Sequence, residues 1–202
     1  MITKVFSKEI AQIQNTSFKK YCIELLDQLP QYILTQPSST GGKYHPTDEI
    51  GSDGMIRHIK RCVLFAKELS IPYELSPIDQ DILLAGCIFH DVLKMGPNNI
   101  PNGIKVYTDT QHPIYIYDFI TKHLPAIDQT NKDDLLLLKM IRRLSLICLY
   151  HEGRWTIDKA REIDRPKTEY SKFLCDVMHT VDFIASRRSV YDIMQKTYFD
   201  EK

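Results

Sequence analysis

Seven histidines are the residues of this sequence best suited to chemistry, and one of them is followed at once by an aspartate. The pair His90-Asp91 comes directly after the apolar segment 82–89, which we expect to form a core helix. Neighbouring residues on a helix point about 100° apart, so the two side chains would not converge by themselves. A metal ion reached by both would use that geometry, and an imidazole and a carboxylate at the end of a buried helix need a partner. The other histidines are His45, His58, His112, His123, His151 and His179.

The order of four of these positions resembles the signature of the HD-domain superfamily of metal-dependent phosphohydrolases. That signature has a histidine on one helix, a His-Asp pair on the next and an aspartate on a late helix. Here these are His58, His90-Asp91 and Asp182. The segment 89–94, Phe-His-Asp-Val-Leu-Lys, is close to the family's HDxxK form, in which the lysine approaches the substrate phosphate. The resemblance covers residues 43–188 and implies an all-α helical bundle.

Two more histidines stand where the binuclear branch of this superfamily places ligands of a second metal. His112 opens an expected helix and His151 closes another, which gives the order H...HD...H...H...D. The resemblance implies two divalent transition metal ions, from among Mn, Fe, Ni, Co and Zn. It implies that Asp91 bridges the ions, with His58, His90 and Asp182 on one and His112 and His151 on the other.

Asp91 and Lys94 are the residues that we expect to act in catalysis. Asp91 would hold both ions, and a hydroxide activated by them would attack phosphorus. Lys94 would stabilise the phosphate as a point charge, unless it is only a solvated lysine at a helix end.

Charged and aromatic residues near the expected ligands are candidates for binding the substrate. Lys43, Tyr44 and His45, in the loop before the first ligand, offer a cation, an aromatic ring and an acid or base. The alternative for them is a rigid surface loop. Arg187 lies about one turn after Asp182 and would contact phosphate or, with Arg188, form outward ion pairs.

Two further candidates follow the ligand His151, and two histidines are left to structure. Arg154 would neutralise phosphate and Trp155 would stack on a base, although this single tryptophan suits the core equally well. His123 is expected to be a cation at a helix C-terminus. His179 lies three residues before an expected ligand, but the family pattern places no ligand there.

Hydrolysis of a phosphate ester is the reaction that this set of residues predicts. We expect a metal-dependent enzyme that cleaves a phosphodiester or phosphomonoester of a nucleotide, cyclic nucleotide or short oligonucleotide. One alternative is a deoxynucleotide triphosphohydrolase or 5′-nucleotidase with one metal. Another is a catalytically weak nucleotide-binding regulator. No Walker loop, Ser-His-Asp order or nucleophilic-cysteine context competes with these interpretations.

Apolar periodicity predicts that helices position these residues. The expected helices cover 7–34 as one or two helices, 55–69, 76 to about 92 or 94, 112–123, 132–151, and 168 to about 198. The expected loops are 36–54, 95–110 and 152–166, with 104–107 as a short strand or extended rim. We expect a helical segment, 1–36, to pack on a phosphohydrolase domain formed by 37–202.

Composition limits the classes of partner. The 202 residues include 26 Lys+Arg and 26 Asp+Glu, and this balance argues against a broad duplex-DNA surface or a polybasic membrane protein. The five cysteines form no CxxC pair, and the sequence shows no signal peptide or membrane span. We therefore expect a cytoplasmic protein with reduced thiols, no membrane partner, and a small phosphate compound or short oligonucleotide as substrate.

Overall fold

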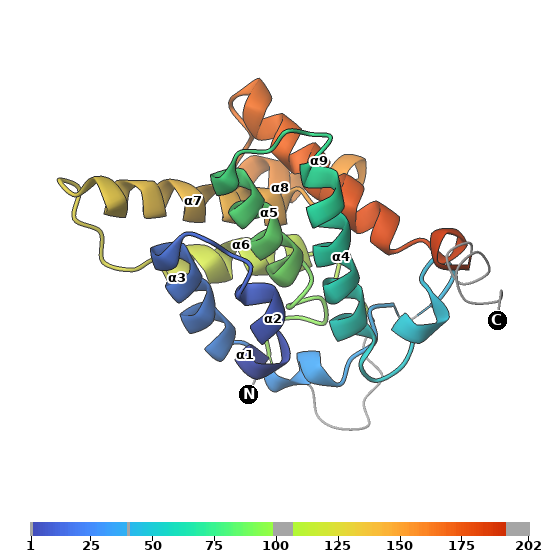
Figure 1. The fold of residues 1–202 in the computed structure, drawn as a ribbon. Helices are drawn as coiled ribbons and strands as arrows, with labels where there is room; N and C mark the ends of the chain where they lie inside the picture. Colours follow the sequence, from blue (N-terminus) through green and yellow to red (C-terminus); the bar gives the residue numbers. More distant parts are fainter. Residues whose placement is uncertain (1, 40, 99–106, 193–202) are drawn as a thin grey trace.

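The computed structural model describes residues 2–39, 41–98 and 107–192, and the regular secondary structure of these ranges is entirely helical (Figure 1). The predicted all-α class is therefore confirmed. The α-helices are α1 (Ile2–Val5), α2 (Ser7–Ile10), α3 (Thr16–Asp27), α4 (Gly54–Ser70), α5 (Pro77–Phe89), α6 (His112–Lys122), α7 (Lys132–Leu149), α8 (Asp158–Ile163) and α9 (Glu169–Ala185). Short 3-10 helices are η1 (Gln31–Leu34), η2 (Thr47–Glu49) and η3 (Gly153–Trp155).

Polar side chains define where several of these helices begin. The Ser76 hydroxyl accepts the backbone N–H of Asp79, and Pro77 takes the first helical position, as the sequence predicts for α5. Asn131 and Thr168 cap α7 and α9 in the same way. Each such cap stabilises its helix by about 1 kcal/mol and fixes the residue at which the helix starts.

Helix α5 lies at the centre of the arrangement. It packs against α4, α7 and α9, and α6 packs along α7 (Figure 1). Every residue from Asp81 to Phe89 is buried, so beyond its first turn this helix has no face toward solvent. Because α5 is enclosed on all sides, the residues that follow it are delivered into the interior of the bundle.

The N-terminal helices pack on this core. Helix α2 contacts α5, and α3 contacts α7. Their side chains Phe6, Ile13 and Phe18 are fully buried and belong to the same hydrophobic cluster as those of α4, α5 and α7. The segment 1–36 thus covers one side of the core, and its division from 37–202 stays a prediction.

The ends of α5 and α9 differ from the prediction. Helix α5 ends at Phe89, before Val92, because the backbone N–H groups of Val92 and Lys94 each bond the carbonyl three residues back and form tight turns. Helix α9 ends at Ala185, because the N–H of Arg188 bonds the Tyr44 carbonyl instead of continuing the helix. Residues 188–192 of that predicted helix are helical after this break, and residues 193–198 lie outside the described residues.

Loop regions also differ in detail. The stretch 152–166, predicted as a loop, contains α8, whose Ala160 is buried against Ile114 and Leu149. The predicted loop 36–54 contains η2. The strand or rim considered for 104–107 lies outside the described residues, except for Tyr107.

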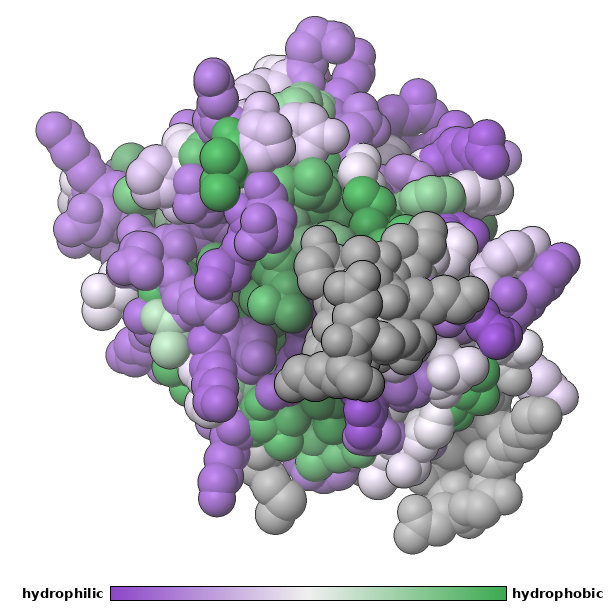
Figure 2. All heavy atoms as spheres, turned by 45° about the vertical axis from the view of Figure 1, so that its right-hand side comes forward, coloured by the Kyte–Doolittle hydropathy of each residue, from purple (hydrophilic) through white to green (hydrophobic). Residues whose placement is uncertain are grey.

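The surface is predominantly polar. In the space-filling view, hydrophilic side chains cover most of the visible face, and hydrophobic ones gather near its middle (Figure 2). All five cysteines are buried and free. Among the described residues, no helix combines the length and the apolar character needed to span a membrane.

Candidate metal centre

Six side chains that the sequence predicts as ligands meet at one place in the structure. His58 lies on α4, His90 and Asp91 form the turn after α5, His112 is the first residue of α6, His151 follows α7, and Asp182 lies on α9. Five of the six are buried, and only Asp182 is half-buried. We call these six residues the candidate metal centre.

The carboxylate of Asp91 faces two separate sets of histidines. Its Oδ1 lies 3.2 Å from Nε2 of His112 and 3.5 Å from Nε2 of His151. Its Oδ2 lies 3.7 Å from Nε2 of both His58 and His90. One oxygen is thus directed at each set, which is the arrangement of a carboxylate that can bridge two ions.

Asp182 completes the set around His58 and His90. Its Oδ1 lies 3.1 Å from Nε2 of His58 and 3.6 Å from Nε2 of His90. Within the sets, the two Nε2 atoms lie 3.3 Å apart for His58 and His90, and 3.1 Å apart for His112 and His151. Ligand atoms about 2.1 Å from one ion lie about 3.0 to 3.4 Å from each other in octahedral or tetrahedral geometry, which these separations match closely.

Backbone carbonyls orient three of the four rings. Nδ1 of His90, His112 and His151 lies 3.0, 2.7 and 2.7 Å from the carbonyl oxygens of Cys87, Asp109 and Cys148, each three residues back. A carbonyl can only accept, so Nδ1 carries the proton, and Nε2 of a neutral ring presents a lone pair. Ligand histidines are commonly held in this way by a second shell.

The facing Nε2 atoms of each histidine pair are more stable with a cation between them than without one. Neutral imidazoles whose Nε2 lone pairs face one another at close range have no proton to share, so a positive charge between them is required. Two groups could each hold a metal ion, namely His58, Cys62, His90 and Asp182, and Asp91, His112 and His151. The residues present therefore fit a metal, and the His/Asp set suits first-row transition ions.

The charges of Asp91 and Lys94 are fixed by their proximity. Nζ of Lys94 lies 2.5 Å from Oδ2 of Asp91. Burial acts to raise the pKa of the Asp91 carboxyl, but Lys94 and His90 outweigh it and hold that pKa well below its usual range. Burial acts to lower the pKa of Lys94, but Asp91 and Asp182 raise it above its ordinary value. At neutral pH an anion and a cation therefore stand side by side in the centre.

One histidine of each set attracts a proton when no ion is present. Burial acts to lower the pKa of His58, but Cys62 and Asp182 raise it to about 10. Burial acts to lower the pKa of His151, but Asp91 raises it. In His90 burial prevails and lowers the pKa. In each set the neighbouring carboxylate thus favours positive charge on one histidine, at the place where an ion would carry it.

Glu49 and Cys62 belong to the surroundings of His58, and the sequence reasoning missed both. Glu49 is fully buried, with Oε2 3.4 Å from Nδ1 of His58 and 2.8 Å from Nδ1 of His45, and its other oxygen pairs with Arg61. Sγ of Cys62 lies 3.5 Å from Nε2 of His58. Cys62 follows His58 by four residues on a helix, a spacing that places the two side chains together. Glu49 lies in a predicted loop, where its spacing from the histidines gives no such signal.

A close backbone approach brings Glu49 to this place. A Cβ on Gly54 would lie 1.9 Å from the carbonyl oxygen of Glu49, so only glycine lets η2 press against the start of α4. His45, Glu49 and His58 also form a group that could hold a metal. Because the Glu49 carboxylate is already paired with Arg61 and His45, and Nδ1 of His58 forms no hydrogen bond within the described residues, we assign Glu49 to an electrostatic contact with His58.

The predicted substrate residues lie around the centre in two places. Two cations lie over the ring of Tyr44. Nζ of Lys43 stands 5.0 Å from its centroid, and the guanidinium carbon of Arg187 stands 5.2 Å from it. The His45 ring lies 5.6 Å from that of His58. Burial and Lys94 lower the pKa of His45 to about 3, so it is neutral.

The second place is the segment after His151. Trp155 is 51% exposed, so the alternative of a core tryptophan is wrong, and the guanidinium carbon of Arg154 stands 4.3 Å from its ring centroid. His179 donates from Nδ1 to the carbonyl of His151 at 2.8 Å. This contact gives His179 the structural role expected for it.

The remaining predicted positions lie apart from the centre. His123 caps the end of α6, where its Nδ1 bonds the Phe119 carbonyl at 2.7 Å. Arg188 pairs with Asp192 at 3.5 Å, which is the outward ion pair considered for it. Neither residue contacts the six ligands in the described contacts.

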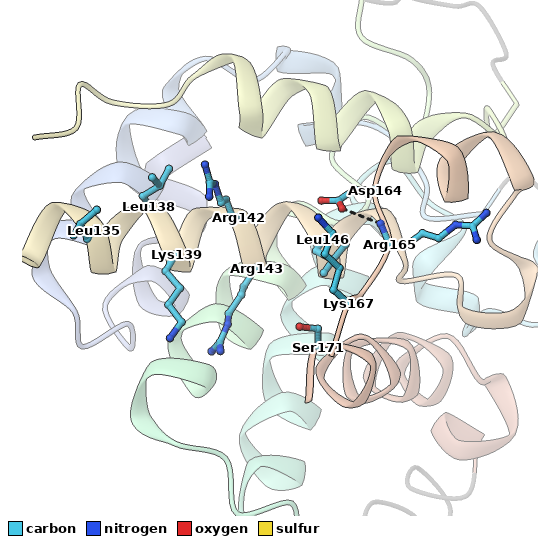
Figure 3. Close-up of a pocket in the computed structure, with 10 residues that line it drawn as sticks. All are labelled: Leu135, Leu138, Lys139, Arg142, Arg143, Leu146, Asp164, Arg165, Lys167 and Ser171. Carbon is cyan, nitrogen blue, oxygen red and sulfur yellow. Dashed lines mark hydrogen bonds between the residues drawn. The ribbon is translucent and has the colours of Figure 1, made fainter. Parts of the chain in front are cut away.

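A basic groove lies along α7 and is separate from the centre. It has a volume of about 360 Å³, and Figure 3 shows its lining on α7 and on the segment 164–171. Five of its side chains are cationic, namely Lys139, Arg142, Arg143, Arg165 and Lys167. None of the six candidate ligands lines the groove, so it is not part of the candidate metal centre.

Comparisons with known proteins add no relative. A scan against family models, a search of curated proteins and a search of solved structures each found no match to this chain. The argument for function therefore depends on the geometry of the site.

Proposed function

We propose that this chain is an HD-type, metal-dependent phosphohydrolase with two divalent transition metal ions. The observation that carries the proposal is the Asp91 carboxylate, whose two oxygens face two different sets of histidines at 3.2 to 3.7 Å. The order of the six ligands in the sequence is also that of the binuclear members of the HD superfamily. The proposed substrate is a phosphodiester or phosphomonoester of a nucleotide, cyclic nucleotide or short oligonucleotide.

Each oxygen of the Asp91 carboxylate faces one set of ligands, and each set would hold one ion. His58, His90 and Asp182 would hold one ion, His112 and His151 the other, and Asp91 would hold both. Bound ions of this kind act as Lewis acids on phosphate and supply a hydroxide nucleophile at neutral pH.

Lys94 is the residue of this chain best placed to act on the phosphate itself. Its ammonium group lies beside Asp91, its side chain is 13% exposed, and its raised pKa keeps it protonated. A fixed cation in a water-poor pocket stabilises negative charge that develops on the phosphate oxygens. Lys94 would therefore bind the phosphate and stabilise the transition state.

The neighbouring acids and bases keep the ligands in the required form. Carbonyl acceptors hold the proton of His90, His112 and His151 on Nδ1, which leaves Nε2 directed at the centre. Glu49 would act on His58 through its negative charge, since its Oε2 lies 3.4 Å from Nδ1 of His58, which forms no hydrogen bond within the described residues. These contacts position the ligands without touching the substrate.

The test is metal content and turnover measured on the same sample. We expect up to two transition metal ions per chain and hydrolysis of at least one compound in a panel of nucleotides, cyclic nucleotides and short oligonucleotides with Mn²⁺. The variant Asp91→Asn should lose both metal and turnover. A matched control is Asp81→Asn, because Asp81 is also buried but bonds the backbone N–H groups of Gln14 and Asn15.

Three outcomes decide the proposal. Turnover that persists in the chelator-treated Asp91→Asn protein would overturn it. One ion per chain with turnover would favour the deoxynucleotide triphosphohydrolase or 5′-nucleotidase alternative. Nucleotide binding by calorimetry with no product from any compound would favour the regulator.

A further inference from the structure

Two exposed aromatic rings lie on segments that adjoin ligands of the candidate metal centre, and neither belongs to the hydrophobic core. Trp155 is 51% exposed and belongs to η3, which begins two residues after His151. Phe183 is 39% exposed and directly follows Asp182. Large apolar side chains left in solvent beside a polar site are typical of a binding surface.

The two rings have the same orientation. Their centroids are 6.5 Å apart, and their planes differ by only 8°. A planar molecule that lies flat on one ring is therefore parallel to the other as well. We call these two parallel, exposed rings the aromatic platform.

Rigid contacts hold the platform relative to the ligands. Gly153, which starts η3, has φ +58°, and a Cβ there would lie 2.5 Å from the His179 ring. His179 in turn bonds the carbonyl of His151 and lies on α9, one turn before Phe183. The turn that carries Trp155 is thus fixed against the helix that carries Phe183 and Asp182.

One guanidinium group lies over each ring of the aromatic platform, and both groups have N–H donors that can bind a ligand. The guanidinium carbon of Arg154 stands 4.3 Å from the Trp155 ring centroid, and that of Arg187 stands 3.8 Å from the Phe183 ring centroid. Within the described part of the chain, neither guanidinium forms an ion pair, and the buried Nε of Arg187 has no hydrogen-bond partner. Such groups are available to the phosphate or the base edge of a ligand.

The geometry points to the aromatic platform of Trp155 and Phe183 as a stacking subsite for the nucleobase of the substrate, with Arg154 and Arg187 as its polar contacts. This inference rests on the proposed function and narrows its substrate class to esters that carry a base. Stacking uses the face of a base, which all bases share, so the subsite selects nucleotides over sugar phosphates and discriminates weakly among bases.

The single tryptophan of the chain provides a direct test, because its fluorescence reports only on the platform. In chelator-treated protein, where no turnover occurs, adenosine monophosphate should quench this fluorescence and ribose 5-phosphate should not. Phe183→Leu should weaken the quenching. The control Tyr73→Leu removes a ring that is 38% exposed elsewhere, and it should leave the quenching unchanged.

Kinetics provide the second test. Trp155→Leu should raise KM for the nucleotide by roughly tenfold or more, the effect of losing one base–aromatic stack, and leave KM for ribose 5-phosphate unchanged. Equal quenching by the two compounds, or an equal change in both KM values, would overturn the inference. So would a dimer that dissociates on Trp155→Leu, which would mark the platform as a protein interface.

The two proposals fail in different ways. If no phosphate ester is hydrolysed, the proposed function fails, while the fluorescence titration still decides whether the platform binds a base. If sugar phosphates are hydrolysed as well as nucleotides and the tryptophan does not respond, the platform is overturned and the proposed function stands.

Discussion

Helix α5 has a polar cluster around a buried carboxylate at each end, and the two clusters are satisfied in opposite ways. At its start, Asp79 accepts hydrogen bonds from Arg143 at 2.8 Å, from the Tyr170 hydroxyl at 2.6 Å, and from Ser76. We call these four residues the Asp79 cluster. At its end lies the candidate metal centre, where Nε2 atoms of histidines face one another. Donors and acceptors balance in the first cluster, but acceptors are in excess in the second.

This difference separates a structural cluster from a functional one. A buried carboxylate whose oxygens all have donors needs no ligand, and its contribution is to stability and to the docking of α7 and α9 on α5. A buried group of converging lone pairs is stable only with a cation, either a metal ion or protons. Burial of polar residues alone would not distinguish the two ends of the helix, whereas the direction of each hydrogen bond does.

The largest expected effect is the loss of one ligand from the metal centre. His112→Gln should lower the rate of hydrolysis by on the order of 10³-fold, about 4 kcal/mol, because one ion loses a ligand opposite Asp91. Metal analysis and initial rates with Mn²⁺ measure the effect. His123→Gln is the matched control, since it alters the histidine at the other end of α6. A His112 variant with unchanged metal content and rate would place the second ion elsewhere.

Metal should raise the Tm of the protein only when the candidate metal centre is intact, whatever the state of the Asp79 cluster. A ligand present at about a thousand times its Kd stabilises the folded state by about 4 kcal/mol, which raises Tm by roughly 10 °C in a chain of this size. We expect Mn²⁺ to produce such a rise in the wild-type protein and in a variant of the Asp79 cluster, and a chelator to reverse it. The rise should vanish in Asp91→Asn. An equal rise in Asp91→Asn would show that the ion binds outside the centre.

Arg143→Met should have the opposite pattern. It leaves Asp79, which is 3% exposed, without its cation, so we expect a loss of about 2 to 3 kcal/mol in the free energy of unfolding. This loss is smaller than the roughly 3 to 5 kcal/mol typical of a fully buried pair, because the Arg143 side chain is 27% exposed. Urea unfolding measures the change. Metal content and turnover should remain those of the wild-type protein, and a loss of bound metal would contradict the separation of the two clusters.

The sequence predicted the fold class because apolar periodicity is a local signal. Apolar periodicity located the long helices, and the Ser76-Pro77 cap gave the start of α5 to the residue. The order of the histidines and aspartates singled out six residues that the structure brings together.

What the sequence could not supply depends on contacts between distant segments. Helix α9 ends at Ala185 because its continuation would compete with the bond from Arg188 to the Tyr44 carbonyl, which no local pattern encodes. Glu49 lies in a loop and reaches His58 only because Gly54 lets η2 approach α4. Phe183 looks like one more apolar residue of a helix until its ring is seen parallel to that of Trp155.

Glu49→Gln should weaken the metal centre by a smaller amount than loss of a ligand. The amide keeps the size of the side chain but removes the negative charge next to His58, so we expect about a tenfold decrease in metal affinity. A competition titration with a chelating dye measures it. Glu9→Gln is the control, because Glu9 is a largely buried glutamate that pairs with Lys60. An unchanged affinity in Glu49→Gln would show that the charge of Glu49 does not act on His58.

Tyr170→Phe should have the smallest effect on the free energy of unfolding, and that effect should disappear at high pH. The variant loses one of the hydrogen bonds to Asp79, and because Tyr170 is 43% exposed we expect only about 0.5 to 1 kcal/mol in the free energy of unfolding. Burial, then the hydrogen bond to Asp79, raise the pKa of Tyr170 to about 12. The folded state therefore keeps the proton that the unfolded state loses near pH 10, so this contribution is complete below about pH 10 and declines as pH rises toward 12. Unfolding curves of both proteins across this range should converge at high pH. A difference that stays constant would show that the hydroxyl acts through packing and not through its bond to Asp79.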